Sequence, residues 1–250
     1  MGTTQTVLTK NLTFYNFILV LKTWSEIGEC IMSQQESGGP LHGVPQKNWD
    51  LFHMIKIIEE KVPRSGYILD VGTSGCPILE ALLRRGYSNL YGIDYNLLLR
   101  EKFHRVVMGA LHRRDFRIFC GYTPIRLKKG NFCQSSYPDN YFDAITSLSV
   151  IEHGIEWEDY FEEMSRILKP GGYLLTSTDY WYHNLPTDQI TAYGYPMKVF
   201  TPSEIKQGLY IAFQYGFKKI DATIPDCVDP CVTWNGFRFT FLLFVLQKIL

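Results

Sequence analysis

The segment between residues 67 and 94 constrains the fold of this chain more than any other part of the sequence. It reads YILDVGTSGCPILEALLRRGYSNLYGID. An apolar run ends in Asp70, a turn of small residues and a helical stretch follow, and a second apolar run ends in Asp94. This order predicts a strand, a turn, a helix and a second strand, a unit that holds nucleotide-like cofactors in α/β proteins.

Length and charge set the broad class of the protein. The 250 residues are enough for one well-buried core. Basic and acidic residues number 25 each, so the net charge is zero and the electrostatic signature of a nucleic-acid binder is absent. Six scattered cysteines favour a reducing compartment, and we expect a cytoplasmic protein. The spacing of Cys227 and Cys231 does not match a zinc site, so we predict no bound metal.

The first 45 residues form a block of their own. An apolar stretch at residues 12–21 is too short to span a bilayer, and no signal-peptide pattern surrounds it, so we expect no membrane association. A helix is predicted over residues 14–32, followed by a loop rich in Gly, Ser and Pro. The block is interpreted as a helical lid or a homodimer contact, and residues 46–250 as the main domain.

Strand and helix patterns alternate through the main domain, which predicts a mostly parallel sheet with helices on both faces. Strands are predicted at residues 67–71, 90–93, 125–129, 142–148, 173–178, 217–223 and 237–247. Helices are predicted at residues 48–61, 77–85, 97–111, 157–168 and 202–215. The last two strands have only a loop between them and should therefore pair antiparallel.

The turn after the first strand does not identify its cofactor by itself. Gly72-Thr73-Ser74-Gly75-Cys76 departs from the Gly-x-Gly-x-x-Gly spacing that a nicotinamide site needs, so a dehydrogenase is disfavoured. Asp94 ends the next strand, where a carboxylate can accept hydrogen bonds from both hydroxyls of a ribose. An ordinary turn aspartate is the alternative interpretation.

Motifs further along the chain resolve this ambiguity. They are YPDNYFDAI at residues 137–145, VIEH at residues 150–153 and RILKPGGYLL at residues 166–175. With ILDVG at residues 68–72 and Asp94, they make residues 48–250 resemble the class I S-adenosylmethionine-dependent methyltransferases, in the small-molecule (methyltransferase type 11-like) branch. The resemblance implies an α/β, Rossmann-like, doubly wound sheet of seven strands in the order 3-2-1-4-5-7-6, and S-adenosylmethionine as cofactor, with S-adenosylhomocysteine as product.

The resemblance also implies which residues bind the cofactor. Asp70 and the turn should lie against its methionine portion, Asp94 should bind the ribose, and the main-chain carbonyl of Leu148 should accept from its ammonium group. The full implied set is Asp70, Gly72, Thr73, Ser74, Asp94, Tyr95, Asn131, Phe132 and Leu148. Ser74 and Cys76 stand where the family has glycines, and Asn131 stands where it often has Asp.

Three residues are candidates for a general base. His153 follows the fourth strand of the domain, and Asp179 and His183 follow the fifth, all on the ligand side of the sheet. Each could instead be structural. The fourth strand ends in Ser147 and Leu148, so only Asp179 is placed to hold a metal, and no Mg²⁺ requirement is predicted.

An aromatic segment is predicted to complete the acceptor pocket. The insertion at about residues 179–200 is expected to cap the site with Tyr180, Trp181, Tyr182, Tyr193 and Tyr195. Aromatic faces with polar tips suit sugar rings, aromatic acceptors or flat natural products. A cap packed on the N-terminal helix is the alternative.

These observations favour an enzyme that methylates a hydroxyl oxygen of a small molecule, either a natural product or a glycan, by in-line displacement. Two alternatives stay open. One is N-methylation of an amine or a peptide. The other is a cofactor-binding or scaffold protein without turnover, for which the Ser74 and Cys76 departures are the support.

Overall fold

The computed structural model describes residues 16–75, 77–97, 125–187, 189–220 and 223–249. Its main sheet has eight strands, and seven of them follow the order β1-β10-β6-β5-β2-β3-β4. The strands are β1 (Phe17–Val20), β2 (Tyr67–Val71), β3 (Asn89–Asp94), β4 (Ile125–Lys129), β5 (Phe142–Leu148), β6 (Leu168–Tyr180), β9 (Val232–Trp234) and β10 (Phe237–Gln247). Strands β2 to β6 pair in parallel, whereas β10 is antiparallel to β6, β1 and β9.

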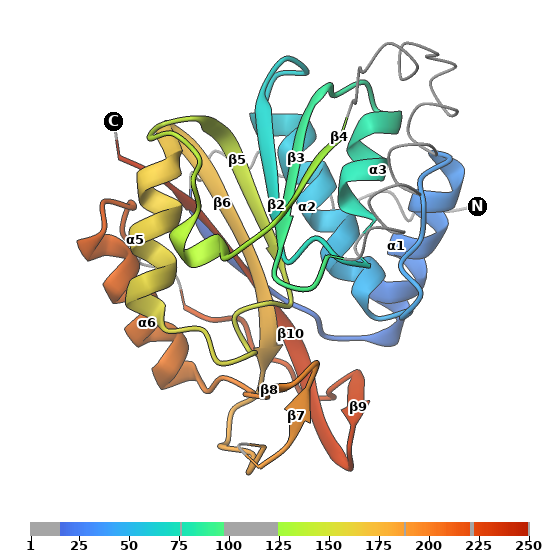
Figure 1. The fold of residues 1–250 in the computed structure, drawn as a ribbon. Helices are drawn as coiled ribbons and strands as arrows, with labels where there is room; N and C mark the ends of the chain where they lie inside the picture. The colour runs from blue at the N-terminus through green and yellow to red at the C-terminus, as the bar shows by residue number, and fades with distance from the viewer. Residues whose placement is uncertain (1–15, 76, 98–124, 188, 221–222, 250) are drawn as a thin grey trace.

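Helices cover both faces of this sheet (Figure 1). One face carries α1 (Trp24–Glu36), α2 (Lys47–Lys61) and α3 (Ile78–Arg84), and the other carries α5 (Trp157–Ile167) and α6 (Pro202–Gln214). The buried apolar residues form two clusters, one on each face of the sheet. The predicted doubly wound α/β fold, mostly parallel with an antiparallel hairpin near its C-terminus, is therefore confirmed.

The central strands have continuous apolar sequences because helices cover both of their faces. All but one residue of β5 is buried, and β10 has nine consecutive buried residues. Such continuous apolar runs are typical of strands that lie between two helical layers. Among the described residues, no helix has both the length and the apolar character needed to cross a bilayer.

The prediction of one helix over residues 14–32 is wrong. Residues 17–20 form β1, an edge strand antiparallel to β10, and α1 begins only at Trp24. The hydroxyl of Thr23 accepts a hydrogen bond from the backbone N–H of Glu26 at 3.2 Å, which caps α1. The apolar sequence FILV therefore completes the core sheet, and a polar capping residue separates it from the helix.

The expected strand at residues 217–223 is also wrong in its described part. Phe217 makes only an isolated bridge with Lys248, and residues 218–220 belong to no strand. The place beside β10 is taken by β1, and the hairpin partner of β10 is β9. The predicted helix at residues 97–111 lies, except for Leu97, outside the described residues.

A small hairpin stands over the carboxyl ends of the parallel strands. Its strands β7 (Thr191–Ala192) and β8 (Tyr195–Pro196) are antiparallel, with Tyr193 and Gly194 at the turn in left-handed conformations. Figure 1 shows β7, β8 and β9 gathered at the same end of the molecule. This is the end at which ligands bind in open α/β sheets.

Candidate functional site

A cavity of about 600 Å³ opens at the carboxyl ends of β2, β3, β5 and β6. Its walls come from segments far apart in the chain, including the turn after β2, the end of β3, the start of α2, the β7–β8 hairpin and β9–β10. We call it the site cavity. Its size suits one or two small molecules, since ligand pockets commonly measure about 300–1,000 Å³.

One half of the site cavity is built from the residues predicted to hold the cofactor. Six of the nine expected residues line it, namely Gly72, Ser74, Asp94, Tyr95, Phe132 and Leu148. Asp94 Oδ2 accepts a hydrogen bond from the backbone N–H of Ser74 at 2.9 Å, and Oδ1 accepts from that of Asn96 at 2.7 Å. Each carboxylate oxygen can accept a further bond, so Asp94 retains capacity for a ligand.

The turn between β2 and α3 depends on its two glycines for different reasons. Gly72 has a φ of +67°, and a Cβ atom there would meet Val150 Cγ2 at 2.3 Å, so the turn packs directly against the segment after β5. Gly75 has a φ of +69°, but a Cβ would have nothing within 4 Å. Gly75 therefore leaves its part of the cavity wall open.

Three of the expected cofactor residues do not line the cavity. Asp70 is buried in the sheet and accepts a hydrogen bond from Thr146 Oγ1 at 2.7 Å. Thr73 is also buried. Asn131 caps a short 3-10 helix, η2 (Phe132–Gln134), by accepting from the backbone N–H of Cys133 at 2.8 Å. These residues shape the wall from behind, and their assignment to cofactor binding stays a prediction.

Aromatic rings connect the cofactor half to the cap. Tyr95 and Phe132 both line the cavity, with their ring centroids 5.3 Å apart and the planes at 64°. The ring of Tyr195 also lies near that of Tyr95, with a centroid separation of 6.4 Å. Such an arrangement gives the cavity a flat apolar edge against which a planar heterocycle can pack.

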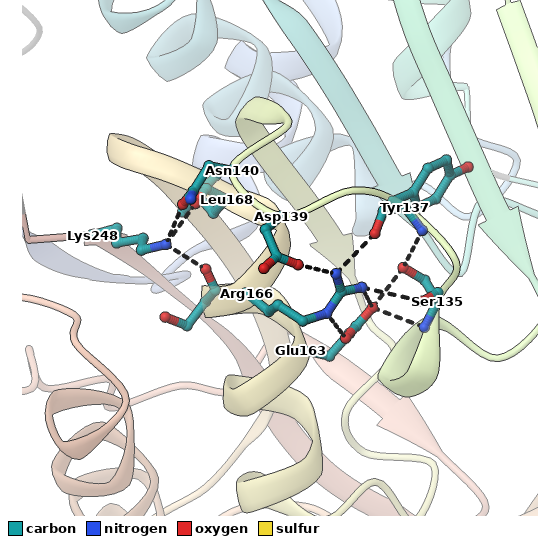
Figure 2. A network of polar contacts seen from close by, with 9 residues as sticks. Ser135, Tyr137, Asp139, Asn140, Glu163, Arg166, Leu168 and Lys248 are labelled. Carbon is teal, nitrogen blue, oxygen red and sulfur yellow. Dashed lines mark hydrogen bonds and ion pairs between the residues drawn. The ribbon is translucent and has the colours of Figure 1, made fainter.

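A polar network fixes the segment that carries Phe132 (Figure 2). Arg166 on α5 donates to the main-chain carbonyls of Ser135 at 3.1 Å and Tyr137 at 2.9 Å, and it pairs with Glu163 at 2.8 Å and Asp139 at 2.5 Å. Glu163 in turn accepts from the backbone N–H of Ser135 at 2.8 Å. The guanidinium thus ties the loop after η2 to α5, which holds one wall of the cavity in place.

The other half of the cavity contains two of the three candidate bases. His153 and Asp179 line it, whereas His183 is exposed and is not part of the wall. Burial and, to a smaller extent, the positive charge of Lys47 lower the pKa of His153, which favours the neutral imidazole. Burial raises the pKa of Asp179 to about 8, although Lys47 opposes this shift.

Only some of the aromatic residues of the predicted cap line the cavity. Tyr193 and Tyr195 line the cavity, and the ring of Tyr193 meets that of His153 edge-on, with centroids 5.6 Å apart. Tyr180 is fully buried, and Trp181 and Tyr182 are half-buried outside the cavity wall. The hydroxyl of Tyr182 accepts a hydrogen bond from the backbone N–H of Cys227, which gives this ring a role in packing the loop.

A group of charged residues lies in this half, which we call the Lys47 cluster: Lys47, Asp50, Glu152 and Asp179. The sequence interpretation named only Asp179 and missed the other three. Lys47, Glu152 and Asp179 line the cavity, and Asp50 lies directly behind Lys47 on α2. Lys47 Nζ is 3.7 Å from Asp179 Oδ1 and 4.0 Å from Asp50 Oδ2. No sequence motif marks Lys47, although Glu152 belongs to the VIEH segment already singled out.

Burial dominates the electrostatics of this cluster. Asp50, Glu152 and Asp179 are all buried, with at most 3% of each side chain exposed. Burial raises the pKa of Asp50 to about 7 and also raises that of Glu152, while the ammonium of Lys47 pulls both down. Three carboxyl groups therefore share one cation, and part of the cluster holds protons at neutral pH.

Apolar side chains close the remaining walls around the cluster. Met197, Trp234, Phe239 and Phe241 line this half of the cavity. The pocket that faces the candidate bases thus has aromatic and aliphatic walls with a few polar groups. This combination suits an organic small molecule that carries one reactive heteroatom.

Comparison with known proteins gives the family of this fold. Residues 69–176 match the family model described as a methyltransferase domain. The chain is 30% identical over 173 residues to a sterol 24-C-methyltransferase of Yarrowia lipolytica, covering 63% of this chain and 43% of that protein. It is 30% identical over 157 residues to the mitochondrial ubiquinone biosynthesis O-methyltransferase of Dictyostelium discoideum, covering 56% of this chain and 46% of that protein.

A solved structure shares the fold across most of both chains. The 1,6-didemethyltoxoflavin-N1-methyltransferase of Burkholderia thailandensis, with 1,6-didemethyltoxoflavin and S-adenosylhomocysteine bound, aligns with a TM-score of 0.54. The alignment covers 92% of each chain at 14% sequence identity. At that identity the likeness establishes the fold alone.

The chain spans less than half the length of each of the curated relatives that it matches here. The family model begins inside β2 and ends inside β6, so it covers the turn after β2, Asp94 and the VIEH segment. S-adenosylmethionine is the cofactor of this family. The match over residues 69–176 supports a class I S-adenosylmethionine-dependent methyltransferase.

Proposed function

We propose that this protein transfers a methyl group from S-adenosylmethionine to a hydroxyl oxygen of a small organic acceptor, with Asp179 as the proton acceptor. One observation carries this proposal. Six of the nine residues that we assign to the cofactor and two of the three candidate bases line the same cavity, whose volume of about 600 Å³ can hold both reactants.

The cofactor half fits a nucleoside with a charged tail. Asp94 offers carboxylate oxygens to a ribose, and the Tyr95 and Phe132 rings can flank an adenine. The open space at Gly75 lets a ligand approach the main chain of the turn. When bound, S-adenosylmethionine supplies an electrophilic methyl group on a sulfonium sulfur.

The protein's own part in the reaction is to position the acceptor and to take its proton. Aromatic walls exclude water and hold the acceptor in line, which can contribute about 7–11 kcal/mol to lowering the barrier. The ionised carboxylate of Asp179 takes the hydroxyl proton as the oxygen forms its bond to carbon and the carbon–sulfur bond breaks. The products are a methyl ether, S-adenosylhomocysteine and a protonated Asp179.

Asp179 is a stronger base than the other candidate in the cavity. Its pKa of about 8 lies near the working pH, where general-base catalysis is most effective. Burial lowers the pKa of His153, so its imidazole is the weaker proton acceptor. We assign His153, together with Tyr193, to the wall that holds the acceptor.

The test compares the three candidate bases in one assay. Methyl transfer from labelled S-adenosylmethionine is measured on matched phenols, alcohols and primary amines with the same ring systems. Asp179→Asn should lower kcat by about 10²–10⁴-fold with unchanged affinity for S-adenosylhomocysteine. His153→Gln should mainly raise KM for the acceptor, and His183→Gln should change little. Full activity of Asp179→Asn would remove this residue as the base.

An amine acceptor is the second candidate, and the charge of the cluster favours it. Three buried carboxyl groups face one lysine, so a protonated amine would find compensating negative charge. Methylation of the amines alone in the panel would select this alternative. Binding of S-adenosylhomocysteine without methylation of any acceptor would instead support a scaffold role.

The role of the N-terminal block stays a proposal. Although β1 belongs to the core sheet, the loop between α1 and α2 supplies His42 and Val44 to the cavity wall. We propose that this loop acts as the lid, in place of a separate helical extension. Raised KM for the acceptor with unchanged cofactor affinity on substitution of Val44 would support it.

A further inference from the structure

Lys47 occupies a central position in the acceptor half of the site cavity. It is the first residue of α2, and its side chain is only 15% exposed. Its ammonium group donates a hydrogen bond to Ser149 Oγ and lies 3.6 Å from the centroid of the Phe241 ring. The same nitrogen is 3.7 Å from Asp179 Oδ1. Lys47 is thus held by partners from three separate elements.

The contacts on either side of Lys47 keep its charge next to Asp179. Ser149 follows β5 in a left-handed conformation, with a φ of +54°, and its N–H donates to the carbonyl of Ser177. Phe241 on β10 is the antiparallel register partner of Asp179 on β6. The Phe241 ring, which contacts the Lys47 ammonium, and the Asp179 carboxylate therefore come from directly paired strands.

The groups that face Asp179 come from every element packed around it. Helix α2 contributes Lys47 and Asp50, and the segment after β5 contributes Glu152 and His153. Strand β10 contributes the uncharged Phe241, and the segment before α6 contributes the backbone N–H of Phe200, which donates to the Asp179 carbonyl at 3.0 Å. Lys47 is the basic side chain that pairs with Asp179 in the described parts of the chain.

Burial and Glu152 favour a protonated Asp179, and Lys47 opposes both. A buried carboxylate without a cation takes up a proton, because charge is costly to remove from water. Glu152 adds a second negative charge nearby, which favours protonation of Asp179 further. A protonated Asp179 could donate a hydrogen bond to the acceptor, but it could not remove a proton from it.

We propose that Lys47 is a positioning residue that shifts Asp179 towards its proton-accepting form at the acceptor end of the cavity. This inference rests on the proposed role of Asp179 as the base. Lys47 does not contact the reacting atoms; it acts through the carboxylate. Asp50 Oδ2 also lies 4.0 Å from the ammonium, so Lys47 divides its effect between a carboxyl group that lines the cavity and one that does not.

The test measures the ionisation of Asp179 directly, with no need for an acceptor. The full chain is labelled with ¹³C at aspartate side-chain carboxyl carbons, and the Asp179 signal is assigned by its loss in Asp179→Asn. Titration from pH 6 to pH 11.5 then follows this signal by NMR. Lys47→Met should move the Asp179 midpoint up by about 1–3 pH units, the size of shift expected from a charge at this distance.

Two further variants test the direction in which nearby charges move the Asp179 midpoint. Glu152→Gln keeps an oxygen that can accept from Thr178 Oγ1 but removes the negative charge, so the Asp179 midpoint should move down. Lys47→Arg keeps the positive charge and should leave the midpoint closer to that of the parent than Lys47→Met does. A residue that only packs the cavity would not move the midpoint in opposite directions in these variants.

The same variants are then compared in the pH dependence of kcat/KM on an acceptor that the parent methylates. The limb that rises with pH should follow the NMR midpoint in each variant. If Lys47→Met and the parent titrate alike, or if Glu152→Gln raises the midpoint, the inference is overturned. If Lys47→Met does not fold, as judged by circular dichroism, Lys47→Gln, which also removes the charge, replaces it in the same titration.

The two proposals fail in distinguishable ways. A midpoint that moves as expected in a protein that methylates nothing would leave the role of Lys47 intact and refute the proposed activity. A protein that methylates its acceptor with an Asp179 midpoint independent of Lys47 would refute the inference and keep the activity.

Discussion

The carboxylate of Asp94 accepts a hydrogen bond from the backbone N–H of Ser74 at 2.9 Å. This contact joins the end of β3 to the turn after β2, so the acidic residue and the turn form one rigid wall of the cavity. It also shows why Ser74 is tolerated where the family has glycine: the bond uses its main chain.

Replacing Asp94 should weaken cofactor binding more than it weakens the fold. In Asp94→Ala the ribose loses its acceptor, and hydrogen bonds to a charged group contribute about 1.5–3 kcal/mol each. We expect the Kd for S-adenosylhomocysteine to rise by roughly 10- to 100-fold in calorimetry. Glu158→Ala, an exposed substitution on α5 outside the cavity, serves as the control. Equal affinity in Asp94→Ala and the parent would exclude Asp94 from the cofactor site.

The two turn glycines offer a matched pair of substitutions. Both have φ near +70°, so alanine at either position meets the same left-handed strain of about 1–2 kcal/mol. Gly72→Ala adds a collision with Val150, and Gly75→Ala adds none. Thermal unfolding should show a larger loss of Tm for Gly72→Ala, whereas Gly75→Ala should mainly weaken cofactor binding. Equal Tm losses would mean that the Val150 contact relaxes at no cost.

The Arg166 network in Figure 2 should support the cofactor half from a distance. Arg166→Met leaves the carbonyls of Ser135 and Tyr137 without their donor, and we expect a loss of about 1–3 kcal/mol in unfolding free energy. Phe132 would lose its fixed position, so affinity for S-adenosylhomocysteine should fall as well. Arg238→Met, which breaks an exposed pair with Asp229, should cost less than about 1 kcal/mol. A similar loss in both variants would count against a supporting role for the network.

The raised pKa of Asp50 should make the stability of the folded protein depend on pH. Its pKa is raised from the ordinary value of 3.8 to about 7, so the folded state holds a proton that the unfolded chain releases. Its contribution is therefore fully present below about pH 4 and is lost as the pH rises towards 7. The Tm of the parent minus that of Asp50→Asn should decrease between pH 5 and pH 8. A difference that grows over this range would show that Asp50 is ionised in the folded protein.

Tyr193 should affect the acceptor and not the cofactor. It lines the cavity at the tip of the β7–β8 hairpin and meets the ring of His153, so Tyr193→Ala removes an aromatic contact from the acceptor half. We expect KM for the acceptor to rise about fivefold or more, since an aromatic contact contributes about 0.5–1.5 kcal/mol beyond its buried area. Tyr182→Phe, outside the cavity, is the control. A change in cofactor affinity alone would place Tyr193 in the other half.

The strands and helices with strong periodic patterns could be predicted from the sequence. The bounds of β2, β4, β5 and β10 coincide with the prediction, because long apolar runs between turn signals are local features. The error at residues 14–32 arose because four apolar residues before a helix read as part of it. Only their pairing with β10, at the far end of the chain, makes them a strand.

Site residues could be predicted from the sequence where they follow directly from the order of the strands. Residues at the ends of parallel strands meet at one edge, which placed Gly72, Asp94 and Asp179 in the cavity. Lys47 could not be found in this way. Its role depends on the start of α2 lying over the ends of β6 and β10, which is a property of packing and not of any motif.

Edge strand β1 also has a consequence for how the chain is made. The carbonyl of Leu21, the residue directly after β1, accepts a hydrogen bond from Thr240 Oγ1, 219 positions later in the chain. During synthesis β1 therefore emerges well before β10, with more than 200 residues translated between the two strands. Pairings of such long range form slowly, so closure of this edge is expected to be a late step in folding. Until β1 pairs, the outer edge of β10 is unpaired, and there the protein is exposed to mispairing with other chains.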